Sequence, residues 1–166
     1  LTSRLEYSMQ PLRMEKVYPV ELARQAVCEF LDGGLEERYE IGFYAGPKSE
    51  SAALQGDEAL LKRALCNLIQ NSIAHNPQGC RIDVSVTGEA TDTIIAVADD
   101  GVGVPAEKLK ELDADSRPME STDEKLNLRH GLGILLVRQI AEAHKGTMTM
   151  ESEPGKGFKT VLVFPP

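Results

Sequence analysis

Cysteine, basic residues and long apolar runs are scarce in this sequence, and each shortage excludes a class of protein. The three cysteines lie far apart, at Cys28, Cys66 and Cys80, which fits neither a disulfide framework nor the C-x-x-C pairs of a zinc site. Lysine and arginine number 18 against 26 acidic residues, giving a net charge of −8, so no nucleic-acid-binding surface is expected. No apolar run approaches the roughly 20 residues that span a bilayer. These shortages favour a cytoplasmic domain with reduced thiols.

The length and the first residues bear on domain organisation. With 166 residues, of which 42% are hydrophobic, the chain fits one compact domain. Apolar residues at four-residue spacing in residues 1–9 predict the end of a helix, which Pro11 stops. Because the chain starts within this pattern and without methionine, we expect a fragment of a longer protein. Residues 1–13 then end a preceding helix and linker, and residues 14–166 form the domain.

The hydrophobic periodicity changes repeatedly along the chain between the helical and the strand period. It predicts an α+β fold: a two-layer α/β sandwich with a mixed sheet of about five strands and about three helices packed on one face. Helices are expected at residues 20–31, 57–76 and 134–144, and strands at residues 39–44, 51–55, 81–87, 93–98, 147–151 and 158–164.

Asn67, Asn71 and His75 form a polar stripe on the helix expected at residues 57–76. They recur every four residues, beside the apolar face that must pack on the sheet. Asparagine is unfavourable in a helix interior, so these side chains need partners. Two interpretations stay open: they cap neighbouring backbone, or they line a cleft where an amide oxygen ligates a hard cation and the histidine meets a phosphate.

Two glycine motifs follow the stripe. Asp99, Gly101 and Gly103 come directly after an apolar strand; the glycines allow close approach to a flat ligand, and the carboxylate can accept a hydrogen bond from an exocyclic amine. Such a motif alone is most often a turn. Further on, Arg129, His130, Gly131, Leu132 and Gly133 precede a helix, where free N–H groups favour a phosphate, although a lone G-x-G is as often structural. Between the motifs, residues 104–129 are polar and lose periodicity.

In this order and spacing, the three motifs resemble the ATP-binding superfamily of gyrase, a heat-shock chaperone, histidine kinases and mismatch-repair ATPases. Residues 67–72 resemble its N box, and residues 99–103 and 131–134 its two glycine boxes. The resemblance continues through residues 140–146 and 155–157 and covers nearly all of residues 17–166.

Within that superfamily the histidine kinases are the most similar. Asn67 stands where the hydrolysing members carry the glutamate that activates water, and residues 5–22 resemble the passage from a dimerisation helix into a kinase domain. The resemblance implies catalytic roles for Asn67 and Asn71, with Asn71 as the Mg²⁺ ligand. It implies that Asp99 binds the adenine amine, that the second glycine box faces the phosphates, and that residues 104–130 form a lid.

The implied function is transfer of the γ-phosphoryl group of ATP, with Mg²⁺, to a histidine on a dimerisation hairpin absent from this chain. The implied partners are the phosphoacceptor helices of the parent kinase and a response regulator. We expect a homodimeric parent, which a membrane anchor can hold at the bacterial cell membrane, and a monomeric fragment. Two alternatives remain: a serine kinase of the anti-sigma type, and a catalytically weak nucleotide-binding or interaction module.

Four departures from the family pattern bear on those alternatives. Ala74 stands where relatives usually carry lysine or arginine, and Arg129 replaces a common glycine. The lid lacks the usual phenylalanine motif, and Phe158 stands where threonine is usual, which leaves an adenine role for Thr160 open. Arg117, Lys125 and Arg129 are candidates for the cation lost at position 74, and Arg129 is the best placed of them.

Overall fold

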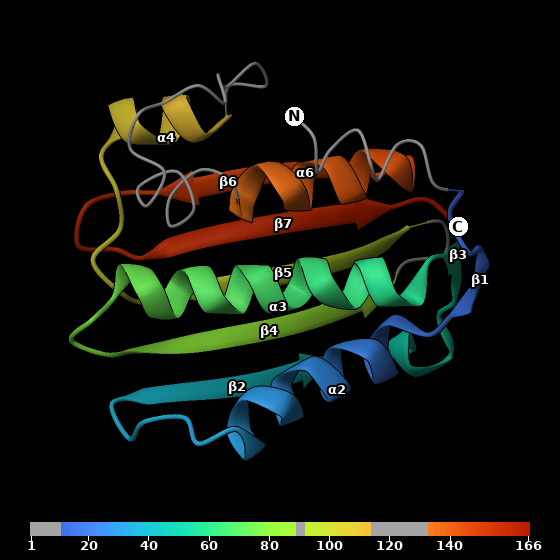
Figure 1. Cartoon of the computed structure of the whole chain (residues 1–166), viewed down its shortest axis with the longest axis horizontal. Helices are drawn as coiled ribbons and strands as arrows, with labels where there is room; N and C mark the ends of the chain where they lie inside the picture. The colour runs from blue at the N-terminus through green and yellow to red at the C-terminus, as the bar shows by residue number, and fades with distance from the viewer. Residues whose placement is uncertain (1–10, 89–91, 114–132) are drawn as a thin grey trace.

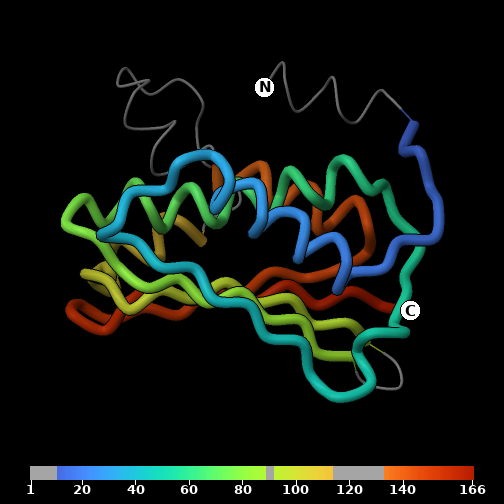
Figure 2. The backbone as a smooth tube through the Cα atoms, turned by 90° about the horizontal axis from the view of Figure 1, so that it is seen from below, coloured from blue at the N-terminus to red at the C-terminus, as the bar shows by residue number. Residues whose placement is uncertain are grey.

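A mixed five-stranded sheet in the order β2-β4-β5-β7-β6 forms one layer of the molecule. The computed structural model describes residues 11–88, 92–113 and 133–166 (Figure 1). Three helices pack side by side on one face of the sheet, as Figure 2 shows edge-on. They are α2 (Pro19–Asp32), α3 (Glu58–His75) and α6 (Gly133–Ala143). The strands of the main sheet are β2 (Tyr39–Ala45), β4 (Cys80–Gly88), β5 (Thr93–Asp99), β6 (Thr147–Ser152) and β7 (Phe158–Phe164). The predicted two-layer α/β sandwich is confirmed.

The strand pairings explain why the sheet is mixed. β2 runs parallel to β4, with Tyr39 opposite Cys80, because α3 lies between the two strands in sequence and provides the crossover that a parallel pair needs. The other pairs, β4 with β5, β5 with β7 and β6 with β7, are antiparallel. The last strand in sequence, β7, therefore lies inside the sheet, between β5 and β6.

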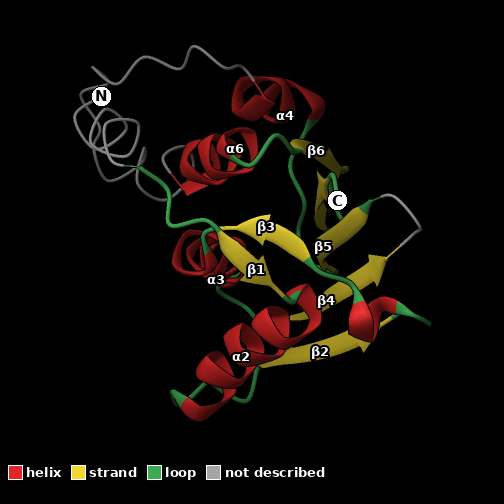
Figure 3. Ribbon diagram, turned by 90° about the vertical axis from the view of Figure 1, so that its right-hand side faces the viewer, coloured by secondary structure: helices red, strands yellow, loops and turns green. Residues whose placement is uncertain are grey.

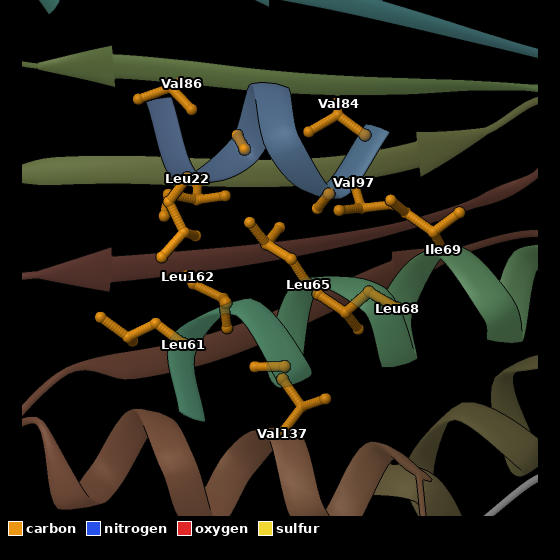
Figure 4. Close-up of a cluster of buried hydrophobic side chains, with 14 of the residues drawn as sticks. Leu22, Leu61, Leu65, Leu68, Ile69, Val84, Val86, Val97, Val137 and Leu162 are labelled. Atoms are coloured by element: carbon orange, nitrogen blue, oxygen red, sulfur yellow. The ribbon is translucent and has the colours of Figure 1, made fainter. Parts of the chain in front are cut away.

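The hydrophobic core fills the space between the helices and the sheet (Figure 4). In β4 the alternation predicted from sequence holds, with Ile82, Val84 and Val86 buried and Arg81 and Asp83 exposed. The predicted apolar arc of α3 packs against these strands. Figure 4 labels its residues Leu61, Leu65, Leu68 and Ile69 together with Leu22, Val97, Val137 and Leu162 from the surrounding elements.

A small second sheet lies at one end of the molecule, the end that faces the viewer in Figure 3. It pairs β1 (Glu15–Val17) antiparallel with β3 (Leu54–Gly56). Sequence analysis missed β1 and placed β3 at residues 51–55, whereas a 3-10 turn, η1, occupies Ser49–Ser51. Strands of three residues contain too few alternations to be recognised by their period.

Beside this small sheet, a buried histidine joins α6 to α3. His144, which is 6% exposed, accepts a hydrogen bond at Nε2 from the backbone N–H of Asp57, at 2.9 Å. Its Nδ1 therefore carries the ring proton and donates it to the carbonyl of Ile140, at 2.7 Å. Asp57 is the N-cap of α3: its carboxylate accepts from the N–H of Leu60 at 3.2 Å and from that of Arg13 at 3.0 Å.

One part of the expected irregular stretch at residues 104–130 is helical, which corrects that prediction. Helix α4 (Ala106–Asp113) lies against β6, and its Leu112 is only 4% exposed. An eight-residue helix with one buried side chain and mostly charged neighbours is too short to show a helical period. The remainder of the proposed lid and the helix end expected at residues 1–9 lie outside the described residues. Across the described ranges, no helix is long and apolar enough to cross a membrane.

Candidate functional site

A cleft opens where α3 and β5 end and α6 begins; Figure 1 shows these termini at one end of the molecule. Four residues predicted from two separate motifs, Asn71 and His75 of the helical stripe and Asp99 and Gly103 of the first glycine motif, line it together. Its apolar wall consists of Leu68, Val97, Val104, Leu112, Ile134 and Phe158. Polar groups thus converge on a largely apolar cleft, which is the usual composition of a small-molecule site.

Helix α3 supplies the polar edge of this cleft. Asn71 and His75 lie one turn apart and are both half-buried, because the stripe borders the face that packs on the sheet. Asn67, one turn earlier, is also half-buried but does not line the cleft. Ala74 is exposed and likewise lies outside the cleft wall. The structure therefore separates the predicted stripe into two cleft residues and one residue beyond it.

Asp99 ends β5 and brings a carboxylate into the cleft. The residue is 9% exposed, and its Oδ1 accepts a hydrogen bond from the backbone N–H of Gly101 at 2.9 Å. Among the described residues, no hydrogen-bond donor engages Oδ2. Asp99 is therefore a buried acceptor with one oxygen held by its own loop and the other available to a ligand.

The loop that follows Asp99 is held from outside by the β6–β7 turn. Gly155 donates its N–H to the carbonyl of Val102 at 2.7 Å, and Val104 donates its N–H to Ser152 Oγ at 2.9 Å. Gly103 has φ +68°, and a Cβ built there would overlap the carbonyl of Glu153. Glycine is required at 103 both by its backbone conformation and by this close approach.

Asn76 fastens the same loop from the α3 side, and sequence analysis did not identify it. Its Nδ2 donates to the carbonyl of Ser72 at 2.7 Å, while its Oδ1 accepts from the N–H of Val102 at 2.8 Å. Asn76 is 2% exposed and lines the cleft. Asn76 follows His75 directly and does not fit the four-residue spacing of the stripe. The spacing that identified Asn67, Asn71 and His75 therefore could not identify Asn76.

The start of α6 lies against Asn71. Gly133 is the first residue of that helix, and a Cβ built on it would come within 3.0 Å of Asn71 Oδ1. The free N–H groups and the positive dipole end of a helix start favour an anion nearby. The other predicted residues of this motif, Arg129, His130, Gly131 and Leu132, lie outside the described residues.

β7 adds the floor of the cleft through Phe158 and Thr160. The two alternate with outward-facing Lys159, as residues of one strand face do. Thr160 is 2% exposed, so its hydroxyl is placed among the cleft residues. The alternation expected for a strand at residues 158–164 already predicts that these two side chains share one face, and Thr160 could have been identified from it.

The carboxylates of Asp99 and Asp100 make the surroundings of Cys80 acidic. Burial raises the pKa of the Cys80 thiol from its ordinary value of 9.0 to about 11, and the nearby carboxylates of Asp99 and Asp100 add to that rise. Cys80 is therefore a neutral thiol rather than a nucleophile or metal ligand. In the described ranges, no cluster of three or more His, Cys, Asp or Glu residues could hold a metal ion. A cation in this cleft would take the Asn71 amide oxygen and oxygens from a ligand.

The arrangement suits a ligand with a flat base and an anionic tail. Apolar side chains can cover the faces of the base, Asp99 can accept from its edge, and the α6 N-terminus beside Asn71 can meet negative charge.

The sequence is similar to those of sensor kinases. It is 36% identical to "Sporulation kinase C" of Bacillus subtilis (strain 168) over 118 residues, which cover 71% of this chain and 26% of that protein. It is 28% identical to "Alginate biosynthesis sensor protein KinB" of Pseudomonas aeruginosa over 163 residues, 98% of this chain and 26% of that protein. The chain thus spans about a quarter of the length of these curated relatives.

Solved structures share the fold. The catalytic domain of histidine kinase ThkA superposes with a TM-score of 0.74 at 20% identity, covering 93% of this chain and 96% of that one. The mycobacterial sensor histidine kinase MprB gives a TM-score of 0.68 at 20% identity, covering 91% and 96%. Residues 56–166, more than half of the chain, match the family described as "Histidine kinase-, DNA gyrase B-, and HSP90-like ATPase". The resemblance found in the sequence motifs is confirmed, and the chain belongs to this family of ATP-binding domains.

Proposed function

We propose that the chain is the ATP-binding kinase domain of a sensor histidine kinase, which transfers the γ-phosphoryl group of ATP to a histidine on a separate dimerisation hairpin. The observation that carries the proposal is the cleft itself, whose wall contains the Asp99 carboxylate and also Asn71, which lies beside the start of α6. The sensor kinases among the relatives support this choice over a serine kinase of the anti-sigma type.

The base end of the nucleotide is assigned to Asp99. Its Oδ1 is occupied by the N–H of Gly101, so Oδ2 is the oxygen that accepts from the adenine amine. Leu68, Val97 and Ile134 contribute apolar surface to the same cleft, and contact with them removes the faces of the base from water. Thr160 places a hydroxyl in this region.

The phosphate end is assigned to Asn71, His75, the second glycine box and the start of α6. The Asn71 amide oxygen fits Mg²⁺, which takes oxygen ligands and is often shared between a protein and the phosphates of its substrate. When bound, Mg²⁺ supplies charge neutralisation on the phosphoryl oxygens, and the protein's own contribution to phosphoryl transfer is mostly positioning. Catalytic roles for Asn67 and Asn71, and binding roles for Gly101, Gly103, Arg129, His130, Gly131, Leu132 and Gly133, belong to this proposal.

His144 offers no phosphoacceptor, because the Asp57 N–H and the Ile140 carbonyl engage both of its ring nitrogens. His75 lies in the cleft wall and His130 borders the second glycine box. The proposed acceptor histidine therefore lies on another part of the parent, with residues 1–13 leading from its dimerisation helix. The structure of histidine kinase ThkA in complex with response regulator protein TrrA contains the same fold, with a TM-score of 0.75 over 45% of that chain. This supports a response regulator as partner of the proposed homodimeric parent.

The test is phosphoryl transfer in trans. The chain is incubated with γ-labelled ATP and Mg²⁺, with or without the separately produced dimerisation hairpin of the parent protein. The expected result is acid-labile phosphohistidine on the hairpin, no label on the chain and little phosphate release without the hairpin. Steady ATP hydrolysis by the chain alone places it with the hydrolysing relatives instead. ATP binding without transfer to the hairpin supports the nucleotide-binding module, the alternative that the exposed Ala74 favours.

A further inference from the structure

We infer that Asn76 is a positioning residue for the nucleotide base: its side-chain amide ties the loop from Asp99 to Gly103 to the end of α3 and so fixes the carboxylate that receives the adenine amine. The inference deepens the proposed function and rests on it, because it concerns how the same cleft is held in shape. Asn76 itself needs no direct contact with the nucleotide to act in this way.

The side-chain amide of Asn76 bridges two elements that are distant in sequence. Nδ2 donates to Ser72, four residues earlier on α3, while Oδ1 accepts from Val102, 26 residues later. The residue is 2% exposed, so water does not replace either bond at low cost. One amide group thus satisfies a carbonyl of the last turn of α3 and an N–H of the loop.

The backbone of Asn76 is itself immobilised, which makes the side chain a firm anchor. Its carbonyl accepts from the hydroxyl of Tyr39 at 2.8 Å and from the N–H of Gly79 at 2.9 Å. Its N–H donates to the carbonyl of Ile73 at 3.2 Å. Tyr39 begins β2 and is 6% exposed, so the anchor is tied to the main sheet as well as to α3.

The anchor reaches Asp99 through two consecutive N–H groups. Val102 donates to Asn76, and the neighbouring Gly101 donates to Asp99 Oδ1. A shift of Val102 moves Gly101 and thereby turns the carboxylate. The β6–β7 turn holds only the carbonyl side of Val102, through Gly155. Without the Asn76 side chain, Val102 keeps the hydrogen bond from Gly155 to its carbonyl and loses the one made by its N–H.

Gly101 shows how closely the loop and the amide meet. A Cβ built on Gly101 would overlap the side-chain amide of Asn76. Unlike Gly103, Gly101 does not have a positive φ, so its backbone would accept alanine. The glycine at this position of the motif is therefore required by the Asn76 side chain. The two positions are predicted to be coupled.

The experiment compares ATP with tripolyphosphate, both in the presence of Mg²⁺, by isothermal titration calorimetry. In Asn76→Ala, ATP affinity is expected to fall roughly 10-fold, the loss typical of one buried hydrogen bond, while tripolyphosphate affinity is unchanged because it has no base. The matched control is Ser49→Ala. It removes the buried bond from Ser49 Oγ to the Gly46 carbonyl, which lies outside the cleft wall, and should alter neither affinity. Thermal unfolding verifies that each variant is folded.

A double-mutant cycle with Gly101→Ala provides the second readout. Gly101→Ala is expected to weaken ATP in the wild-type background, where its methyl group meets the amide, and to add little in the Asn76→Ala background. Additive effects, equal losses of ATP and tripolyphosphate, or wild-type ATP affinity in folded Asn76→Ala each overturn the inference. If Asn76→Ala does not fold, unchanged ATP affinity in Gly101→Ala overturns it. Failure of the wild-type chain to bind ATP rejects the proposed function instead.

Discussion

Replacing Asp99 by asparagine is the most direct test of how the cleft receives a base. The substitution keeps the size of the side chain and removes its charge. In the structure, Asp99 Oδ1 accepts from the N–H of Gly101 at 2.9 Å. The single carbonyl oxygen of an asparagine will keep that bond, because only an oxygen can accept there. Its NH₂ group then takes the place of Oδ2 and presents donors where the adenine amine needs an acceptor.

The magnitude follows from the burial of the site. Asp99 is 9% exposed, so water cannot readily restore the lost interaction. A hydrogen bond to a charged group contributes about 1.5–3 kcal/mol, which corresponds to a roughly 10- to 150-fold loss of ATP affinity. GTP carries a carbonyl at the corresponding position of its base and can accept from the new NH₂. The ATP-to-GTP affinity ratio should therefore fall by more than ATP affinity alone.

Asp100→Asn is the matched control. It removes the same charge from the adjacent residue, but Asp100 is exposed and its carboxylate accepts from the N–H of Arg81 at 2.8 Å, outside the cleft. Calorimetric titration of both nucleotides into the three proteins separates the local hydrogen bond from the change of net charge. An ATP-to-GTP ratio that is unaltered in Asp99→Asn, or that changes equally in Asp100→Asn, refutes the assignment of the base to Asp99.

Three further predictions concern the metal, a thiol and a helix cap. Asn71→Ala should abolish the enhancement of ATP binding by Mg²⁺ while the exposed neighbour variant Gln70→Ala retains it; calorimetry with and without Mg²⁺ decides, and equal Mg²⁺ enhancement in both variants removes Asn71 as the ligand. Because the pKa of the Cys80 thiol is raised to about 11, only about one molecule in a thousand carries the Cys80 thiolate at pH 8. Mass spectrometry after brief iodoacetamide treatment should therefore find Cys80 far less alkylated than exposed Cys28. The unfolded chain loses this proton first as pH rises, so the Cys80 contribution to the free energy of unfolding is present below pH 9 and is lost as pH approaches 11; a contribution that grows over that range, in a comparison with Cys80→Ala, contradicts the shift. Asp57→Ala removes the N-cap of α3 and should lower the free energy of unfolding by about 0.5–2 kcal/mol in urea, with unchanged stability as the contrary outcome.

The long elements could be predicted because each contains several periods of its pattern. Helix α3 runs for 18 residues and β4 for nine, so their buried faces repeat often enough to be recognised. The same reasoning failed for β1, β3 and α4, because each of them contains only one or two periods of its hydrophobic pattern. Pairing with another segment, rather than the residues themselves, gives those short elements their structure.

The candidate site divides in the same way. Asn71 and Asp99 were found because an asparagine inside a helix and a D-x-G-x-G after a strand are locally unusual. Asn76 follows a helix, where asparagine is ordinary, and its role appears only through Val102. Thr160 likewise gains a role only when β7 is inserted beside β5. A residue that is unusual in its local pattern can be recognised from the sequence, whereas a contact between distant segments can be recognised only in the folded structure.

The hydrogen bonds between the β6–β7 segment and the loop after Asp99 have a consequence for biosynthesis. Strand β7 lies inside the sheet, between β5 and β6, and the turn that precedes it holds Val102 and Val104 in place. A nascent chain that has not yet emerged from the ribosome as far as Thr160 lacks both the floor of the cleft and these hydrogen bonds. Because a ligand stabilises only the state that binds it, ATP cannot stabilise such an incomplete chain. Under the proposed function, ATP would therefore stabilise the complete domain and not its truncated forms.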